Sequence, residues 1–285
     1  MLSWKIGDVT VKRVVETEMP VAYHEKHPFL PGARPEALAE IPWLYPHYVT
    51  PEGALRLSIH ALLVEAPGLK LVVDTCIGND RPRQITGRQP LSTDFLQQFE
   101  ASGWTRDSVD AVVCTHLHVD HVGWNTMLVD GRWVPTFPKA RYLLGRTEYE
   151  HWMSESDGET GEILADSVSP IFDAGLAELV EMDHRLSPEV RLKPTPGHTP
   201  GHVSVVIESE GQTALITGDF MHHPSQIARP DWCPPFDHDT DASTATRKAM
   251  IAELADQPTL VIGTHFAAPT AGRIVRDGDS HRFEA

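Results

Sequence analysis

Short apolar runs bounded by turn-forming residues recur along the chain, and this pattern predicts strands more often than helices. We predict strands near residues 9–16, 56–65, 69–74, 109–114, 141–145, 178–182, 191–194, 202–208, 213–218 and 259–263. Apolar positions at helical spacing predict helices near 92–102, 146–154, 161–176 and 242–256, the third of which Pro170 should break or kink. Strands and helices in this order favour one domain of two similar halves, with two packed sheets inside and helices outside.

The segment at about residues 20–54 follows neither pattern. It is rich in proline, and Phe29, Trp43, Tyr45 and Tyr48 are interleaved with the prolines. Fixed φ angles and missing N–H donors disfavour a strand or a long helix here. A loop of this length in a compact domain is usually functional or disordered, and its aromatic content disfavours disorder. We therefore expect a flap over a functional site or a contact in a homodimer, and the sequence leaves both open.

Three imidazoles and one carboxylate follow directly on the strand predicted at 109–114, at His116, His118, Asp120 and His121. Imidazole nitrogen and carboxylate oxygen are ligands that suit Zn²⁺ and its neighbours. His116 and His118 lie on one side of an extended chain, whereas Asp120 and His121 can face a second ion from a turn. One short loop thus offers two candidate ligands to each of two metal ions.

Further candidate ligands lie at three later strand ends. His198 stands in a loop between two Pro-Gly breakers, Asp219 follows the strand predicted at 213–218, and His265 follows the strand at 259–263. Loops at strand ends carry the chemistry of α/β proteins, so these side chains are expected to converge. We expect the histidines at 24, 27, 47, 151, 184 and 281 to be ordinary, and leave those at 60, 202, 223 and 238 open.

The order H-x-H-x-D-H, Gly-His-Thr-x-Gly, Gly-Asp and a late His resembles the dinuclear signature of the metallo-β-lactamase superfamily, over roughly residues 62–265. The resemblance implies an α+β fold, the four-layer αββα sandwich, as a single domain over residues 1–285. It also implies that His116, His118 and His198 bind one metal ion, that Asp120, His121 and His265 bind a second, and that Asp219 bridges the two. We expect zinc, and the ligand types also allow Mn, Co or Fe. Asp74, after another apolar strand, would support a metal-bound histidine.

The chemistry implied by this resemblance is hydrolysis by a metal-bridging hydroxide, with Asp120 passing a proton to the leaving group. Asp219 stands where one large group of β-lactamases has Cys, and His118 stands where flavin-linked diiron reductases have an acid, which disfavours both branches. His222 stands three residues after Asp219, at the position where acyl-homoserine lactonases have Tyr. A His at this position resembles the organophosphate hydrolases and the related aryl-ester and lactone hydrolases. Its side chain either donates a hydrogen bond to the oxyanion or substrate, or only lines the pocket.

We expect Trp124, Phe220, Trp232 and Phe236 to line a substrate pocket, because aromatic residues near the ligands suit an apolar substrate. Packing against a partner subunit is the alternative for the stiff loop that holds Trp232 and Phe236. The prediction is a dinuclear hydrolase of small esters or lactones. The alternatives are an organophosphate triester hydrolase, an N-acyl-homoserine lactone lactonase and a mononuclear iron oxidoreductase.

Charge and cysteine content narrow the choice of partners and compartment. The chain has 24 Lys+Arg against 40 Asp+Glu, a formal net charge of −16, which repels phosphate backbones and disfavours nucleic acid. Three cysteines far apart do not suggest a disulfide framework. The N-terminus lacks the apolar run of a signal peptide, and no segment has the length of a membrane span. We therefore expect a cytoplasmic protein that acts on a small molecule and not at a membrane.

Overall fold

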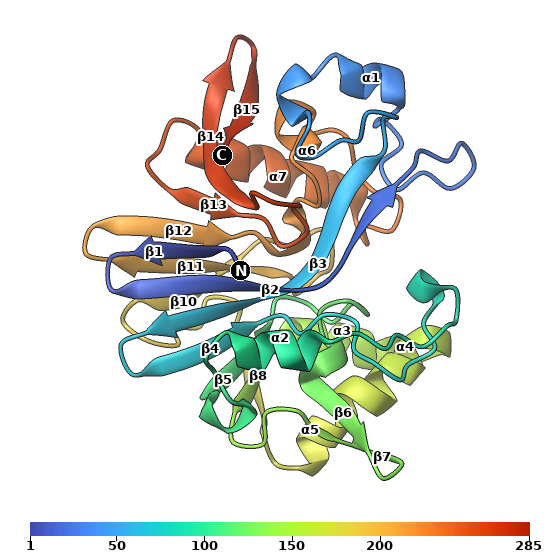
Figure 1. Ribbon diagram of the computed structural model, residues 1–285, viewed down its shortest axis with the longest axis vertical. Coiled ribbons are helices and arrows are strands. Elements are labelled where there is room, and N and C mark those ends of the chain that lie inside the picture. Colours follow the sequence, from blue (N-terminus) through green and yellow to red (C-terminus); the bar gives the residue numbers. More distant parts are fainter.

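Two β-sheets lie face to face at the centre of the computed structural model, which describes residues 1–285 (Figure 1). The first sheet has seven strands in the order β1 (Ser3–Ile6), β2 (Val9–Val21), β3 (Leu55–Ala66), β4 (Leu69–Val73), β5 (Ala111–Cys114), β8 (Arg141–Gly145) and β9 (Ala177–Val180). The second has six, in the order β10 (Val190–Pro194), β11 (Val203–Ser209), β12 (Gln212–Ile216), β13 (Leu260–Ile262), β14 (Ala271–Asp277) and β15 (Ser280–Glu284). A separate hairpin is formed by β6 (Thr126–Val129) and β7 (Arg132–Pro135).

Helices cover the outer side of each sheet. Beside the first sheet, in the lower part of Figure 1, lie α2 (Phe95–Ala101), α3 (Arg146–Ser154), α4 (Gly158–Ile163) and α5 (Ser169–Asp173). Beside the second sheet lie α1 (Pro35–Ala39), α6 (Ser225–Ala228) and α7 (Thr240–Leu254). None of these helices has both the length and the apolar character needed to cross a membrane. The four layers confirm the predicted αββα sandwich.

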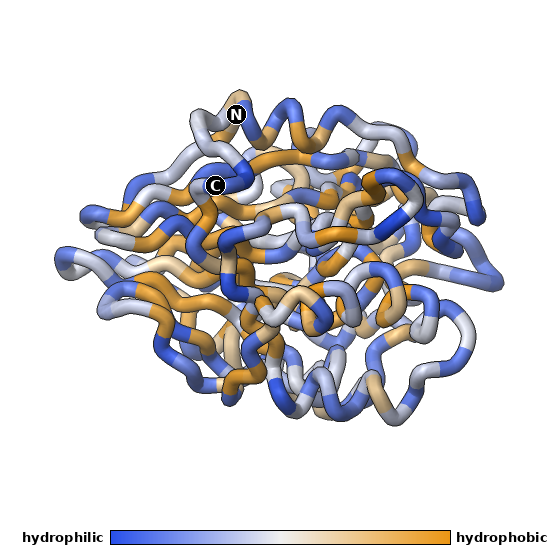
Figure 2. Tube along the Cα trace, turned by 90° about the horizontal axis from the view of Figure 1, so that it is seen from below, coloured by the Kyte–Doolittle hydropathy of each residue, from blue (hydrophilic) through white to orange (hydrophobic).

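The protein has three apolar cores, and successive side chains along a central strand point alternately into the cores on its two sides. In β5, Ala111 and Val113 face the core between the two sheets, whereas Val112 and Cys114 face the core under the helices α2 to α5. A third core lies between the second sheet and α7. Figure 2 shows that apolar stretches follow the strands and that hydrophilic residues gather at the turns. Because the central strands are buried on both faces, they read as continuous apolar runs in the sequence.

The predicted elements match the structure best where both periodicity and turn residues are strong. The strand 141–145 and the helix 146–154 coincide with β8 and α3. The helix predicted at 161–176 is instead α4, one turn of π-helix at Leu164–Val168, and α5, with Pro170 in the first turn of α5, where its missing N–H costs nothing. The predicted strands omit the hairpin β6–β7 and the last pair β14–β15.

The proline-rich segment contains more regular secondary structure than the sequence suggested. Pro20 lies within β2, beyond the residues of β2 that pair with β1, so its missing N–H faces an open edge of the sheet. The segment also contains α1 and buries Leu38, Leu44 and Tyr48 in the core beside α7. Phe29 lines the cavity described below, as expected of a flap.

Parallel pairing brings the chemically interesting loops to one edge of the sandwich. β4 pairs in parallel with β5 and β5 with β8, while β12 pairs in parallel with β13. The carboxyl ends of parallel strands lie at the same edge of a sheet. The loops that follow β4, β5, β12 and β13 therefore hold Asp74, the residues 116–121, Asp219 and His265 close together.

Candidate metal centre

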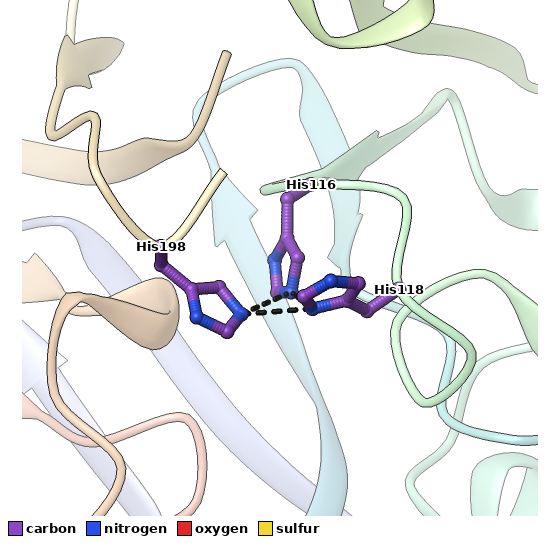
Figure 3. Close-up of side chains that lie close together, drawn as sticks. All are labelled: His116, His118 and His198. Atoms are coloured by element: carbon purple, nitrogen blue, oxygen red, sulfur yellow. Dashed lines mark hydrogen bonds between the residues drawn. The ribbon is translucent and has the colours of Figure 1, made fainter. Parts of the chain in front are cut away.

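Three histidines from two distant loops meet in a triangle of ring nitrogens (Figure 3). His198 Nε2 lies 2.8 Å from His118 Nδ1 and 3.2 Å from His116 Nε2, and His116 Nε2 lies 2.9 Å from His118 Nδ1. The resemblance seen in the sequence implied that these three side chains bind one metal ion. The structure brings them together, with His116 and His198 fully buried and His118 lining a cavity.

A second group lies beside the first and contains Asp120, His121 and His265. His265 Nε2 is 3.3 Å from His121 Nε2, and each of the two Asp120 oxygens is 3.6 Å from one of these ring nitrogens. The close spacing of these groups matches the second set of candidate ligands expected from the sequence.

Asp219 lies between the two groups. Its Oδ2 atom is 3.1 Å from His265 Nε2, 3.3 Å from His121 Nε2 and 3.6 Å from His198 Nε2. The Oδ1 atom is buried and has no hydrogen-bond partner. Burial favours the neutral acid, but the facing His265 and His121 hold the pKa of Asp219 well below its ordinary value. A carboxylate with a free buried oxygen between two histidine groups is suited to bridging two cations.

The donor set fits metal binding better than internal hydrogen bonding. A neutral imidazole has only one N–H, and three ring nitrogens that point at one another cannot all be satisfied by in-plane hydrogen bonds. Burial, together with neighbouring histidines, lowers the pKa of His116 and of His198 well below the ordinary value, so both rings are neutral and each offers a lone pair. A divalent cation would accept these lone pairs simultaneously.

Carboxylate and carbonyl oxygens contact the Nδ1 atoms of three rings whose Nε2 atoms face the cluster. As expected, Asp74 Oδ2 accepts from His121 Nδ1 at 2.9 Å, and Asp74 also accepts from the Thr115 N–H at 2.7 Å. His265 Nδ1 donates to the Ser58 carbonyl at 3.0 Å. His198 Nδ1 lies 2.6 Å from Asp237 Oδ1, a contact that the sequence did not suggest because Asp237 stands 39 residues away in a proline-rich loop. Such partners fix the tautomer and ring orientation of metal-binding histidines.

The Asp237→Asn variant is expected to bind metal about 10–100-fold more weakly than wild type. The amide keeps an acceptor oxygen for His198 Nδ1 but loses the charge that strengthens this ring as a ligand. Metal retention in competition with a chelator measures the effect. Asp231→Asn is the matched control, because Asp231 lies in the same loop but is exposed and pairs with Lys248. Equal retention in both variants would remove this role from Asp237.

Two buried side chains fix the loops that carry the histidines. Glu148, on α3, accepts from the Leu117 N–H and the Gly201 N–H, both at 3.0 Å. Gly201 has no side chain, and a Cβ there would lie 2.3 Å from the Glu148 nitrogen. His202 Nε2 accepts from the Asp219 N–H at 2.6 Å. The sequence left His202 open and did not identify Glu148, since an acidic residue in a helix carries no local signal of burial.

A cavity of about 570 Å³ lies above the cluster. Its floor includes His118, Asp120, Asp219, His222 and His265. Its walls are mainly apolar and come from several parts of the chain: Met19, Val21, Phe29, Leu57, Ile59, Ile85, Val119 and Phe236. Gln84 and Glu159 complete the lining, which contains no Lys or Arg.

Of the four expected pocket residues, Phe236 lines this cavity and the other three do not. Trp124 is buried in the core under α2, where it stacks on Phe95 and its Nε1 donates to Glu16 at 2.7 Å. Glu16 is the extra residue of a β-bulge in β2, which turns its carboxylate inward. The other two, Phe220 and Trp232, pack in or against the core beside α7. These rings are used for packing and not for the cavity wall.

His222 is part of the cluster and not a distant wall residue. Its Nε2 lies 3.2 Å from Asp219 Oδ2, and its ring is 4.9 Å from that of His198 between centroids. Neither ring nitrogen makes a hydrogen bond within the protein. The rings of Phe29 and Phe236 contact it from the cavity side. His222 is thus held by apolar packing with both nitrogens available.

Comparison with known proteins agrees with this arrangement. The family model described as the metallo-beta-lactamase superfamily matches residues 55–265. An N-acyl homoserine lactonase of Bacillus thuringiensis is 26% identical over 180 residues, which cover 59% of this chain and 65% of the lactonase. A probable metallo-hydrolase of Mycobacterium tuberculosis is 28% identical over 194 residues, which cover 59% of this chain and 58% of that protein. The match thus spans less than two thirds of the length of either relative.

Solved structures resemble the whole chain. The hydrolase AbOPH, described as a member of the beta-lactamase superfamily, superposes with a TM-score of 0.81 at 22% identity and covers 99% of this chain and 96% of its own. AidC, described as a dizinc quorum-quenching lactonase, superposes with a TM-score of 0.78 at 18% identity over the same shares of both chains. At these identities the similarity concerns the fold.

Proposed function

The chain belongs to the metallo-β-lactamase superfamily, and from this premise we propose that it is a metal-dependent hydrolase of small, uncharged esters or lactones. One observation carries the proposal: six imidazole and carboxylate side chains surround Asp219 at the floor of an apolar cavity. His116, His118 and His198 would hold one divalent ion, and Asp120, His121 and His265 the other. Zinc suits this donor set, and Mn, Co and Fe are the alternatives.

Two ions held there would polarise the carbonyl or phosphoryl oxygen of a substrate and lower the pKa of water enough for attack at neutral pH. The protein's own groups would do the rest. Asp120 lines the cavity floor and would pass a proton to the leaving oxygen. His222, with ring nitrogens unpaired within the protein, would donate an N–H to the oxygen that gains negative charge. An Asp120→Asn enzyme with full metal content and full activity would contradict the first role, and the same result for His222→Ala would contradict the second.

The cavity supports a neutral substrate with an apolar arm. Aliphatic and aromatic side chains form its walls, and the charged groups of its lining, Asp120, Glu159 and Asp219, are all acidic. Beyond the proposed metal ions, the lining has no Lys or Arg to pair with an anionic group on the arm of a substrate, in a protein whose formal net charge is −16. Phe236 and Ile85 line the cavity while remaining 45% and 46% exposed, which provides an apolar rim for the end of such an arm.

Metal analysis beside a panel of lactones, aryl esters, phosphotriesters and a β-lactam tests the proposal. Wild type is expected to bind two zinc-like ions per chain and to hydrolyse neutral lactones or esters. His118→Ala is expected to lose metal and activity, because His118 belongs to the first triangle of ring nitrogens. His47→Ala is the matched control, since His47 is exposed and belongs to none of the groups that could hold a metal ion.

Other outcomes point to the alternatives. Preferred turnover of phosphotriesters would favour an organophosphate triester hydrolase with the same residues in the same roles. Preferred turnover of N-acyl homoserine lactones would favour a lactonase of that specificity. A single iron per chain without hydrolysis of any class would contradict the proposal and favour an oxidoreductase.

A further inference from the structure

A second group of side chains with metal-ligand chemistry lies outside the centre just described. His151 and Glu155 stand on and directly after α3, and His238 stands in the segment between α6 and α7. One ligand atom from each of the three lies within 4.8 Å of the other two. The group combines two imidazoles with a carboxylate and draws on two segments 83 residues apart in the chain, from 155 to 238.

Local geometry leaves these side chains free to close on an ion. His151, in the last turn of α3, and Glu155, directly after it, have Nε2 and Oε2 3.9 Å from each other. The rings of His151 and His238 are 4.7 Å apart between centroids at 76°, and a ring nitrogen of one lies within 4.8 Å of a ring nitrogen of the other. Glu155 and His238 are exposed and His151 is partly exposed, so packing does not hold these side chains in their present rotamers.

The group is connected to the candidate metal centre on both sides. On the α3 side, Trp152 follows His151, contacts the His118 ring at 5.2 Å between centroids and donates to Glu148 at 2.6 Å. On the other side, the His238 N–H donates to the His198 carbonyl at 3.0 Å, and the preceding Asp237 holds the His198 ring.

We propose that His151, Glu155 and His238 form a third metal site that takes a divalent transition-metal ion of the zinc, nickel or copper type, completed by water. Imidazole ligands select this class of ion over Mg²⁺ and Ca²⁺. The ion ties α3 to the segment before α7, and these two elements carry the groups that contact His118 and His198. A bound ion would therefore restrict the motion of His118 and His198, which lie in different loops of the candidate metal centre.

Metal stoichiometry tests this site directly. Wild type and the double variant His151→Gln/His238→Gln are loaded with Co²⁺ and equilibrated by dialysis at several free Co²⁺ concentrations. Wild type is expected to hold about one Co²⁺ per chain more than the double variant at the highest concentrations. The matched control is His184→Gln/His281→Gln, which removes two histidines outside every metal-binding group and should keep the wild-type stoichiometry.

A thermal shift supplies the second readout. Excess Co²⁺ should raise the unfolding temperature of Co²⁺-loaded wild type further than that of the double variant, because an ion bound only by the native state stabilises that state by mass action. Equal stoichiometry and equal thermal shifts in the two proteins would overturn the proposal and leave His151 and Glu155 as an ordinary polar contact at the end of α3. If the double variant holds less metal than His118→Ala, its substitutions damage the main centre. That result would also contradict a separate third site.

Discussion

The Asp219→Asn variant is expected to lose most of its metal and to hydrolyse its substrate about 10³-fold more slowly than wild type. Asp219 is the one carboxylate that faces both groups of histidines, with Nε2 atoms of His265, His121 and His198 between 3.1 and 3.6 Å from its Oδ2. Asn has nearly the same volume but no charge, so packing is preserved while the electrostatic attraction for the two proposed cations falls. Metal ions contribute several kcal/mol to such transition states, and each 1.4 kcal/mol corresponds to about tenfold in rate.

Metal content and kcat/KM measured on the same preparation check this result. Asp183→Asn is the matched control, because Asp183 is exposed and outside the cluster. Circular dichroism of both variants separates loss of metal from loss of fold. An Asp219→Asn enzyme that keeps two ions and wild-type kcat/KM would exclude Asp219 as the group between them.

The Glu148→Ala variant is expected to lose about 3 kcal/mol of unfolding free energy. Its carboxylate is 1% exposed and accepts from three donors: the Leu117 N–H, the Gly201 N–H and Trp152 Nε1. Each buried donor left without a partner costs about 1–3 kcal/mol, and we take the lower end because the change also removes a buried carboxylate. Leu117 lies between His116 and His118, so activity should fall as well, by about 10²-fold for a displacement near 1 Å.

Urea denaturation and kcat/KM measure the two effects. Glu150→Ala, on the same helix but exposed, should change both by little. Glu148→Gln should lie between the two, since its carbonyl oxygen can keep two donors while its amide nitrogen faces the third. If Glu148→Ala unfolds at the same urea concentration as Glu150→Ala, Glu148 does not hold the two loops.

The elements that position the centre were largely predictable, because their signals are local. Strands β4, β5, β12 and β13 are buried on both faces, and each reads as an apolar run followed by a turn and a ligand-type residue. The hairpin β14–β15 carries a Gly278-Asp279 turn that could have been recognised, since Gly-Asp between two runs is a hairpin signal. The split of the helix at 161–176 follows from Pro170, but the π-helical turn before it has no comparable sequence signal.

Residue type and order along the chain also determined which side chains could bind metal, from His116 in the first loop to His265 in the last. Tertiary structure decided what surrounds them. Asp237 and Glu148 are ordinary acids in sequence, and they support the centre only because folding brings them to His198, Leu117 and Gly201. The cavity walls could not be predicted either: Trp124 points into a core and Met19, from the first long strand, lines the cavity. The ability of a side chain to bind a metal ion follows from its residue type, which the sequence gives directly. Its burial and its hydrogen-bond partners depend on contacts between residues that are distant in the chain.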